Sequence, residues 1–303
     1  MIELAAEFGG GPVVATISPF AASLLRLRSG GVDLVQPSDG RHPELSAGAV
    51  LVPWPNRVAR ATWVLDGDAQ RLRVTEPELG HALHGLLMRR RYEVASRGPR
   101  WVVLSAGIAD EPGYPFRLAT SVRYELVAGG LAVMHELENL GDRAAPVAIG
   151  AHPYLRLGDE PLAGLRLEVP AGEALELDDR SHLPVRRFRV DRTPYDLRRG
   201  TSVAEVVRHA AYTCFGASGG RVEHRLSAAN GRATVLWADP DFRWVQVWVT
   251  DAFPGAPDGR AIAIEPMTAP PDAFNSGTDL KWLAPRGRWR TRWGIRISGA
   301  PAG

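Results

Sequence analysis

The 303-residue chain contains a single cysteine, Cys214. One thiol excludes an internal disulfide framework and a cysteine-based zinc site, and it is typical of a protein in a reducing compartment. The chain also lacks a long apolar run, and its first residues, MIELAAEFGG, lack the basic and apolar regions of a signal peptide. We therefore expect a cytoplasmic protein that neither is secreted nor spans a membrane.

Lysine is almost absent as well. Lys281 is the only lysine among 36 basic residues, and the others are arginines. A compositional bias explains most of this, although the planar arginine fork also binds hydroxyls and anions in ways that lysine does not. The basic residues are interspersed with 34 acidic ones, for a formal net charge of +2. This even distribution argues against a nucleic-acid partner.

Helical periodicity is scarce. The spacing Ser202-x-x-Glu205 resembles a capping box and predicts a short helix over 202–209. Alternation with a period of two prevails elsewhere. In 243–250 the valines fall on one face and the tryptophans, Gln246 and Thr250 on the other, which indicates a strand covered on both sides.

Turn signals separate the expected strands. Asn230-Gly231 predicts a hairpin between 222–226 and 233–237, and Asp66-Gly67 predicts one between 61–65 and 71–74. The 24 prolines and 32 glycines are spread along the chain, as many short connections require. We predict one domain over 1–303 of the all-β class, a large antiparallel β-sandwich. The other expected strands are 13–17, 23–28, 92–96, 101–106, 120–127, 131–138, 165–169, 185–190, 261–265 and 292–298.

Four segments place functional side chains beside proline or glycine: 53–58, 83–86, 150–154 and 264–275. Loops and strand ends on a rigid β-scaffold are where functional sites usually lie. His152 precedes Pro153, which fixes its backbone as extended, and a histidine serves as a general acid or base near neutral pH. Glu265 ends an apolar strand, where a carboxylate is costly unless it is paired or faces a cleft.

The motifs resemble those of the aldose 1-epimerase (galactose mutarotase) family. The matching pieces are Asn56-Arg57, Leu83-His84-Gly85, His152-Pro153-Tyr154, the segment 193–198 (TPYDLR), and Glu265-Pro-Met-Thr268 running on to Pro271-Asp-Ala-Phe-Asn275. They stand in the order of the family and span about residues 56 to 275. The resemblance implies a galactose mutarotase-like supersandwich with an open sugar-binding cleft. It also implies cofactor-free and metal-free interconversion of the α and β anomers of a small-molecule aldose.

The resemblance also assigns roles to individual residues. Ring opening removes a proton from the anomeric hydroxyl and gives one to the ring oxygen, and a carboxylate and a histidine supply both transfers. Glu265 is expected as the general base and His152 as the general acid. His84 is expected to contact the ring oxygen or a neighbouring hydroxyl, and Arg57 and Asn56 to bind hydroxyls.

One segment departs from the family pattern. Many members carry an aspartate three residues before a phenylalanine, and that aspartate binds sugar hydroxyls. Counting back from Phe215 places Tyr212 at this position, so Tyr212 is expected to contact the sugar. Either hydroxyl recognition is altered, or the match is displaced by a few residues and another group has this role.

Two other functions remain open at this point. A mutarotase for a hexose 6-phosphate would use Arg60 or the Arg89-Arg90-Arg91 run to bind phosphate. A non-catalytic sugar-binding protein on the same fold would not need the pair of Glu265 and His152. A glycoside hydrolase requires two suitably spaced carboxylates, and the motifs supply one. His81-x-x-His84 does not have the spacing of a cupin-like metal site.

Overall fold

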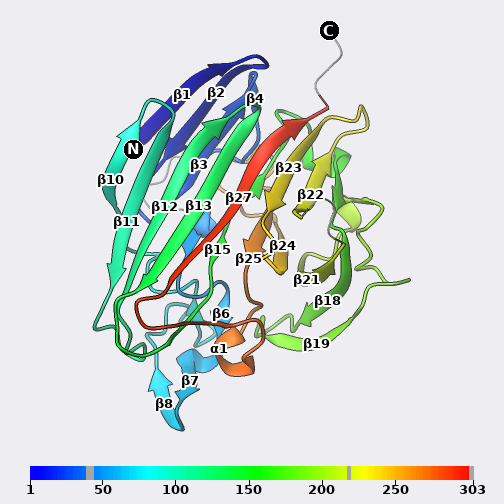
Figure 1. The fold of residues 1–303 in the computed structure, drawn as a ribbon. Coiled ribbons are helices and arrows are strands. Elements are labelled where there is room, and N and C mark those ends of the chain that lie inside the picture. Colours follow the sequence, from blue (N-terminus) through cyan, green and yellow to red (C-terminus); the bar gives the residue numbers. More distant parts are fainter. Residues whose placement is uncertain (39–43, 217–219, 300–303) are drawn as a thin grey trace.

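Two large antiparallel sheets dominate the computed structural model, which describes residues 1–38, 44–216 and 220–299 (Figure 1). The nine-stranded sheet has the order β10 (Glu93–Gly98), β11 (Trp101–Ile108), β12 (Leu118–Val127), β13 (Gly130–Asn139), β27 (Arg288–Ser298), β23 (Ala233–Ala238), β22 (Val222–Ser227), β17 (Arg166–Glu168) and β20 (Thr201–Ser202). The eight-stranded sheet has the order β19 (Pro184–Arg189), β18 (Ala171–Leu177), β21 (His209–Phe215), β24 (Trp244–Thr250), β25 (Ala261–Met267), β15 (Gly150–Ala151) and β5 (Val50–Leu51), with β16 (Tyr154–Leu155) also paired to β25.

Smaller elements complete the fold. A four-stranded sheet joins β1 (Ile2–Phe8), β2 (Gly11–Ile17), β3 (Leu24–Ser29) and β4 (Val32–Asp33). Three two-stranded ladders pair β6 (Arg57–Val58) with β9 (Ala82–Leu83), β7 (Thr62–Leu65) with β8 (Asp68–Arg71), and β14 (Ala145–Val147) with β26 (Lys281–Leu283). The helices are short: α1 (Ala273–Ser276) and the 3₁₀ turns Glu44–Ser46, Ala59–Ala61, Leu162–Gly164 and Val203–Glu205. No helix in the described part of the chain is long and apolar enough to cross a membrane.

The main core lies between the large sheets. It contains Leu131 and Ile295 from the nine-stranded sheet and Val245, Val247 and Ile264 from the eight-stranded sheet. Because side chains alternate along a strand, the neighbours of these core residues on β24 and β25 point to the outer face of the eight-stranded sheet. That outer face carries the cavity described below.

Most of the expected strands are present, and the all-β antiparallel architecture is confirmed. The Asp66-Gly67 turn has positive φ at both residues, but β8 begins directly after it, at residue 68 instead of 71. The hairpin of β22 and β23 is confirmed as well. Its turn uses positive φ at Gly231.

The predicted helix over 202–209 is wrong. Only Val203–Glu205 form a 3₁₀ turn, Ser202 makes no side-chain capping bond in the described structure, and β21 already begins at residue 209. The amide of Val203 donates to the carbonyl of Leu165 instead, and the Val203 side chain is buried. Burial of this β-branched residue against the sheet outweighs the local capping signal.

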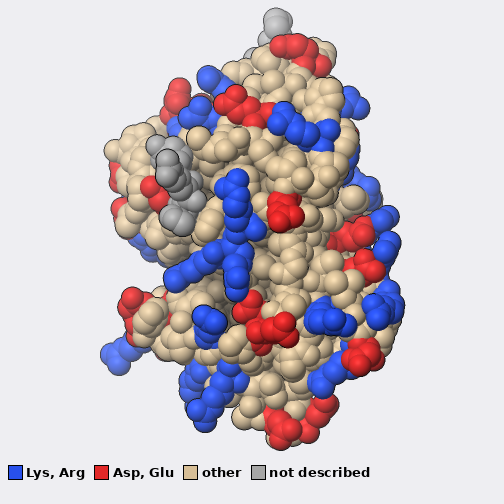
Figure 2. Space-filling view, turned by 90° about the vertical axis from the view of Figure 1, so that its left-hand side faces the viewer, with Lys and Arg blue, Asp and Glu red and all other residues tan. Residues whose placement is uncertain are grey.

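Arginine pairs with acidic residues over much of the surface. On the face shown in Figure 2, most of the area is uncharged, acidic and basic side chains alternate towards the right-hand and upper edges, and a group of basic side chains lies near the middle. The outer face of the nine-stranded sheet carries ladders such as Arg288–Glu138 and Arg290–Glu136. Exposed pairs of this kind contribute little to stability individually, about 0–1 kcal/mol each.

Candidate active site

A cavity of about 320 Å³ opens on the outer face of the eight-stranded sheet. Side chains of β21, β24 and β25 line it from the sheet. The 3₁₀ turn Glu44–Ser46, the segments around β6 and β9, and the loops that carry Glu76, His152 and His182 contribute the rest. Its volume lies at the lower end of the range for small-molecule sites. The lining residues are Leu45, Ser46, Asn56, Arg57, Glu76, Leu83, His84, His152, His182, His209, Trp248 and Glu265.

Glu265 and His152 meet at the base of this cavity. Glu265 stands on β25, opposite Gln246 of β24, and its side chain is 3% exposed. His152 follows β15, and its backbone is held by hydrogen bonds with Ala49 and Gly48 on either side. His152 Nε2 lies 3.5 Å from Glu265 Oε1. Glu265 Oε2 is buried and has no hydrogen-bond partner in the described structure, so its hydrogen-bonding capacity is unused.

Burial controls the protonation of this pair. Desolvation raises the pKa of Glu265 to about 8, although the positive charge of Arg57 acts in the opposite direction. Desolvation lowers the pKa of His152 to about 3. Between these values the two groups together hold one proton, which rests on the carboxyl group.

His84 presents a hydrogen-bond donor to the same region. Its Nδ1 accepts a hydrogen bond from the Asn56 amide, at 3.2 Å, and its own amide donates to the Asn56 carbonyl. Neutral histidine carries one ring proton, so acceptance at Nδ1 places that proton on Nε2. Burial and the nearby Arg57 and His152 lower the pKa of His84 well below its usual range, which keeps the ring neutral. The His84 and His152 rings lie 5.2 Å apart, edge to face.

Arg57 lines the cavity as part of an ion pair. Its Nε and Nη2 donate to the two carboxylate oxygens of Glu76, at 2.8 and 2.6 Å. Its Nη1 points to the Asn56 side-chain oxygen, at 3.5 Å, and keeps donor capacity for a ligand. The bidentate pair fixes the guanidinium in place and balances its charge.

The motif over 265–275 connects the loops that line the cavity. Asp272 accepts hydrogen bonds from the Ala59 amide and from Asn275, and its own amide donates to the Arg57 carbonyl. Thr268 exchanges hydrogen bonds with the backbone of Ile149, just before His152. The motif therefore connects Glu265 with the loops that carry Arg57 and His152.

Gly85, next to His84, allows a close backbone approach. Its φ is +78°, and a Cβ there would lie 2.2 Å from the Val52 carbonyl oxygen. Any other residue at this position would push the His84 loop away from the backbone of Val52.

His84, His152 and Glu265 place ligand atoms within 4.8 Å of one another, a spacing that could also hold a metal ion. A histidine that binds a metal through one ring nitrogen normally donates the other N–H to an acceptor. His84 Nδ1 does the opposite and accepts from the Asn56 amide. The trio therefore fits hydrogen bonding to a ligand better than it fits metal coordination.

Tyr212 does not belong to this cavity, and its expected contact with a ligand is corrected. Strand β21 pairs Tyr212 with Val245 of β24, so the Tyr212 side chain points into the core between the sheets, where it is fully buried. His209, three residues earlier, pairs with Trp248 and lines the cavity. Moving the aspartate-x-x-aromatic match back by three residues puts His209 at the aspartate position and Tyr212 at the aromatic one. This displaced match is the alternative to altered hydroxyl recognition at Tyr212.

Other lining residues were missed as well, among them Glu76, His182 and Trp248. Glu76 and His182 stand in loops without any motif, and only the fold brings them to the cavity. Trp248 had a signal, since it alternates with the core valines of β24. Its ring contacts His152 edge to face, at 6.0 Å.

The candidate phosphate-binding arginines lie outside the cavity lining. Arg90 pairs with Glu111, and Arg89 donates to the Thr75 carbonyl. Among the described residues that line the cavity, Arg57 is the only arginine or lysine, and it is paired with Glu76.

Comparison with known proteins identifies the relatives of this chain. The family model described as aldose 1-epimerase matches residues 8–296. The chain belongs to the aldose 1-epimerase family. Among family relatives, it is 30% identical to the Escherichia coli (strain K12) protein YihR, over 91% of this chain and 88% of YihR. It is 29% identical to the galactose mutarotase of Sus scrofa, over 52% of this chain and 46% of that protein.

The epimerase-family fold is also found among solved structures. An aldose epimerase homologue from C. elegans superposes with a TM-score of 0.84, over 99% of this chain and 98% of that one, at 22% sequence identity. The likeness confirms the galactose mutarotase-like fold expected from the motifs.

Proposed function

We propose that this protein is an aldose 1-epimerase that interconverts the α and β anomers of a free, uncharged aldose. The observation that carries the proposal is the buried contact between Glu265 and His152 at the base of the cavity, 3.5 Å apart. Family membership supports an isomerase of this type. The pair supplies one group that accepts a proton and one that donates a proton, as ring opening requires.

Ring opening begins when the shared proton moves from the Glu265 carboxyl group to His152. The charge on Arg57 favours the resulting carboxylate. Glu265 then takes the proton of the anomeric O1 hydroxyl while His152 gives its proton to the ring oxygen O5. The C1–O5 bond breaks, C1=O1 forms, and the pair returns to the neutral state that burial favours.

Closure reverses these transfers. Rotation about C1–C2 presents the other face of the aldehyde to the O5 hydroxyl. His152 accepts the O5 proton as O5 attacks C1, and Glu265 gives its proton to O1. His84 Nε2–H is a neutral donor that stabilises negative charge developing on the sugar oxygen near it. No cofactor is needed, because protons lost and gained balance within the pair.

The charges of the site favour an uncharged sugar over a hexose phosphate. A phosphate needs cationic partners, and the cavity offers one guanidinium that already makes a bidentate pair with Glu76. The hydroxyls of a free aldose need neutral donors and acceptors instead, which His84 and Asn56 can supply.

The test is the optical rotation, or the NMR anomer ratio, of freshly dissolved α-glucose and α-galactose with and without the protein. We expect faster equilibration, reduced by a factor of about 10²–10⁴ in Glu265→Gln and in His152→Asn. Arg290→Ala, an exposed change on the far sheet, is the matched control and should keep full activity. Absence of acceleration for every free aldose in a panel of hexoses and pentoses contradicts the proposal. Binding without acceleration favours a sugar-binding protein, and acceleration of a hexose 6-phosphate alone favours the phosphate-specific alternative.

A further inference from the structure

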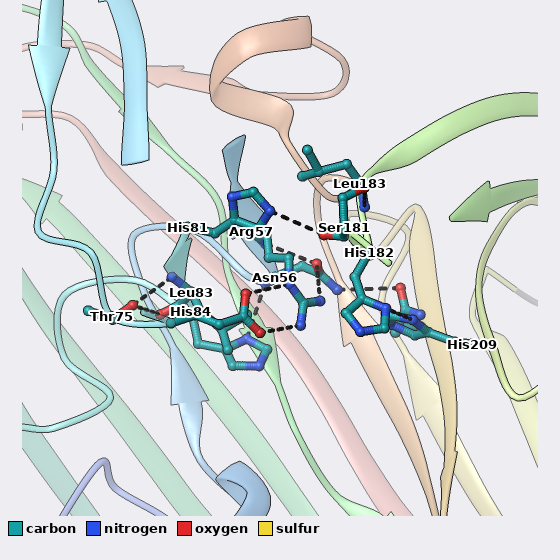
Figure 3. A network of polar contacts seen from close by, with 12 residues as sticks. Asn56, Arg57, Thr75, His81, Leu83, His84, Ser181, His182, Leu183 and His209 are labelled. Atoms are coloured by element: carbon teal, nitrogen blue, oxygen red, sulfur yellow. Dashed lines mark hydrogen bonds and ion pairs between the residues drawn. The ribbon is translucent and has the colours of Figure 1, made fainter. Parts of the chain in front are cut away.

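Two histidine rings face each other on the wall of the cavity away from the acid–base pair. His182 Nδ1 and His209 Nδ1 lie 3.1 Å apart, and the ring centroids are 4.8 Å apart at an interplanar angle of 70° (Figure 3). Both residues line the cavity. The reaction steps above do not use either ring.

The short Nδ1–Nδ1 contact determines the tautomers of the pair. One Nδ1 must carry a proton and the other must accept it. The ring that donates then has an unprotonated Nε2, and the ring that accepts carries its proton on Nε2. The pair therefore offers one hydrogen-bond acceptor and one donor at its two Nε2 atoms.

Both rings are neutral near neutral pH. Burial lowers the pKa of His209 to about 3, and the charges of Arg57 and the two neighbouring histidines act in the same direction. Burial also lowers the pKa of His182, whereas Glu76, Asp178 and Asp179 act against the change. An uncharged donor–acceptor pair suits a hydroxyl group, which both donates and accepts.

The fold fixes the position of the pair relative to Glu265. His209 of β21 is the register partner of Trp248 on β24, and Gln246 on β24 is the partner of Glu265 on β25. His209 and Glu265 thus stand on the same face of the sheet, two strands apart and two residues apart along the strands. Strand geometry puts their Cα atoms about 12 Å apart, which leaves room for a sugar ring between the side chains.

A second set of contacts orients His182. Its amide donates to the Asp178 carbonyl, and the Asp178 carboxylate caps the same loop through the Ser181 amide. The Ser181 carbonyl lies 3.1 Å from His81 Nε2, and His81 Nδ1 accepts from the Arg60 amide. Acceptance at Nδ1 leaves the His81 proton on Nε2, so this ring donates to Ser181 and ties the loop to the opposite wall.

We propose that His182 and His209 form a hydroxyl-recognition unit that binds a non-anomeric hydroxyl of the sugar and determines which aldoses the protein accepts. This inference rests on the proposed function. The pair offers one acceptor and one donor at its two Nε2 atoms on the cavity wall, so it can bind a hydroxyl group through both of the hydrogen bonds that a hydroxyl makes. His209 is expected to contact the sugar, and His182 is expected to position it by fixing the tautomer.

The experiment measures kcat and KM for anomer interconversion with glucose, galactose and a set of monodeoxy glucoses. We expect the wild-type protein to discriminate against at least one monodeoxy sugar. In His209→Ala and His182→Ala we expect KM for the parent sugar to rise about tenfold with kcat changed less than threefold, and the discrimination against that deoxy sugar to disappear. Arg180→Ala, an exposed change in the same loop, is the matched control and should keep both values.

A spectroscopic measurement gives a second readout. NMR of ¹⁵N-histidine-labelled protein without sugar should detect one Nδ1–H···Nδ1 hydrogen bond between His182 and His209. Either alanine substitution should remove this signal. If the wild-type protein accelerates anomer interconversion of no aldose, both the proposed function and this inference are refuted. If it is active and both variants keep the wild-type pattern of deoxy-sugar discrimination, the role of the histidine pair is refuted and the proposed function stands.

Discussion

Replacing Glu265 with glutamine should stabilise the protein, and the gain should grow with pH. The Glu265 carboxyl group has a pKa of about 8 in the folded protein and an ordinary value of 4.5. Between these two values the unfolded chain binds fewer protons at this residue than the folded chain does. Stability contributed by this group therefore falls as pH rises from 4.5 to 8.

Linkage converts the two pKa values into free energy. The cost of keeping Glu265 in its buried site is about 1 kcal/mol at pH 5, about 3 kcal/mol at pH 7 and about 4 kcal/mol at pH 8. These are upper values, because relaxation of the site reduces them. Glutamine has nearly the same shape and no carboxyl group, so it does not incur this pH-dependent cost.

The assay is reversible urea unfolding of wild-type protein and Glu265→Gln at pH 5, 7 and 8. Titrating groups distant from Glu265 are common to both proteins and cancel in the difference. His152, which contacts Glu265, has a pKa of about 3 and is neutral over the whole range from pH 5 to pH 8. We expect the difference in unfolding free energy to increase by about 2–3 kcal/mol from pH 5 to pH 8. A difference that stays flat or decreases over this range refutes the assignment of a raised pKa to Glu265.

Two further predictions concern activity and loop support. The value of kcat/KM should be level between about pH 4 and 7 and should fall tenfold per pH unit above about pH 8, because the Glu265–His152 pair then loses its shared proton. Buffer-corrected polarimetry measures this profile. A rate that rises through pH 8 contradicts the one-proton state. Asp272→Ala leaves two hydrogen-bond donors without their acceptor, so it should lower the unfolding free energy by about 1–3 kcal/mol and raise KM. Asp272→Asn keeps an acceptor oxygen and tolerates the φ of +60°, so it should lose less. Equal losses of unfolding free energy in both variants, measured by urea unfolding, would contradict the role of the acceptor oxygen.

The sequence predicted the parts of the site that stand in short motifs. Asn56, Arg57, His84, His152 and Glu265 all line the cavity, because each motif also contains the proline, glycine or aspartate that holds its own loop. The placement of Tyr212 failed for a different reason. Along a strand an error of one or three residues exchanges the two faces, so a match displaced by three points to the core.

The remaining site residues depend on contacts distant in sequence. His182 reaches the cavity because His81, about 100 residues earlier, contacts its loop, and no local pattern encodes that distance. Glu76 is fixed by its ion pair with Arg57 across a loop without regular structure. The overall β-architecture was easier to predict, since period-two alternation and glycine turns are local signals.

Side chains along β24 and β25 alternate between the core and the cavity, so adjacent residues are under two different kinds of selection, for stability and for activity. Ile264 belongs to the core, and Glu265, the next residue, belongs to the cavity. Substitutions at positions that face the core (inward positions) change the stability and hence the amount of folded protein. Substitutions at positions that face the cavity (outward positions) change which molecules are turned over. Paralogues can therefore acquire new substrate ranges through outward positions and loops while the inward set stays under constant stabilising pressure.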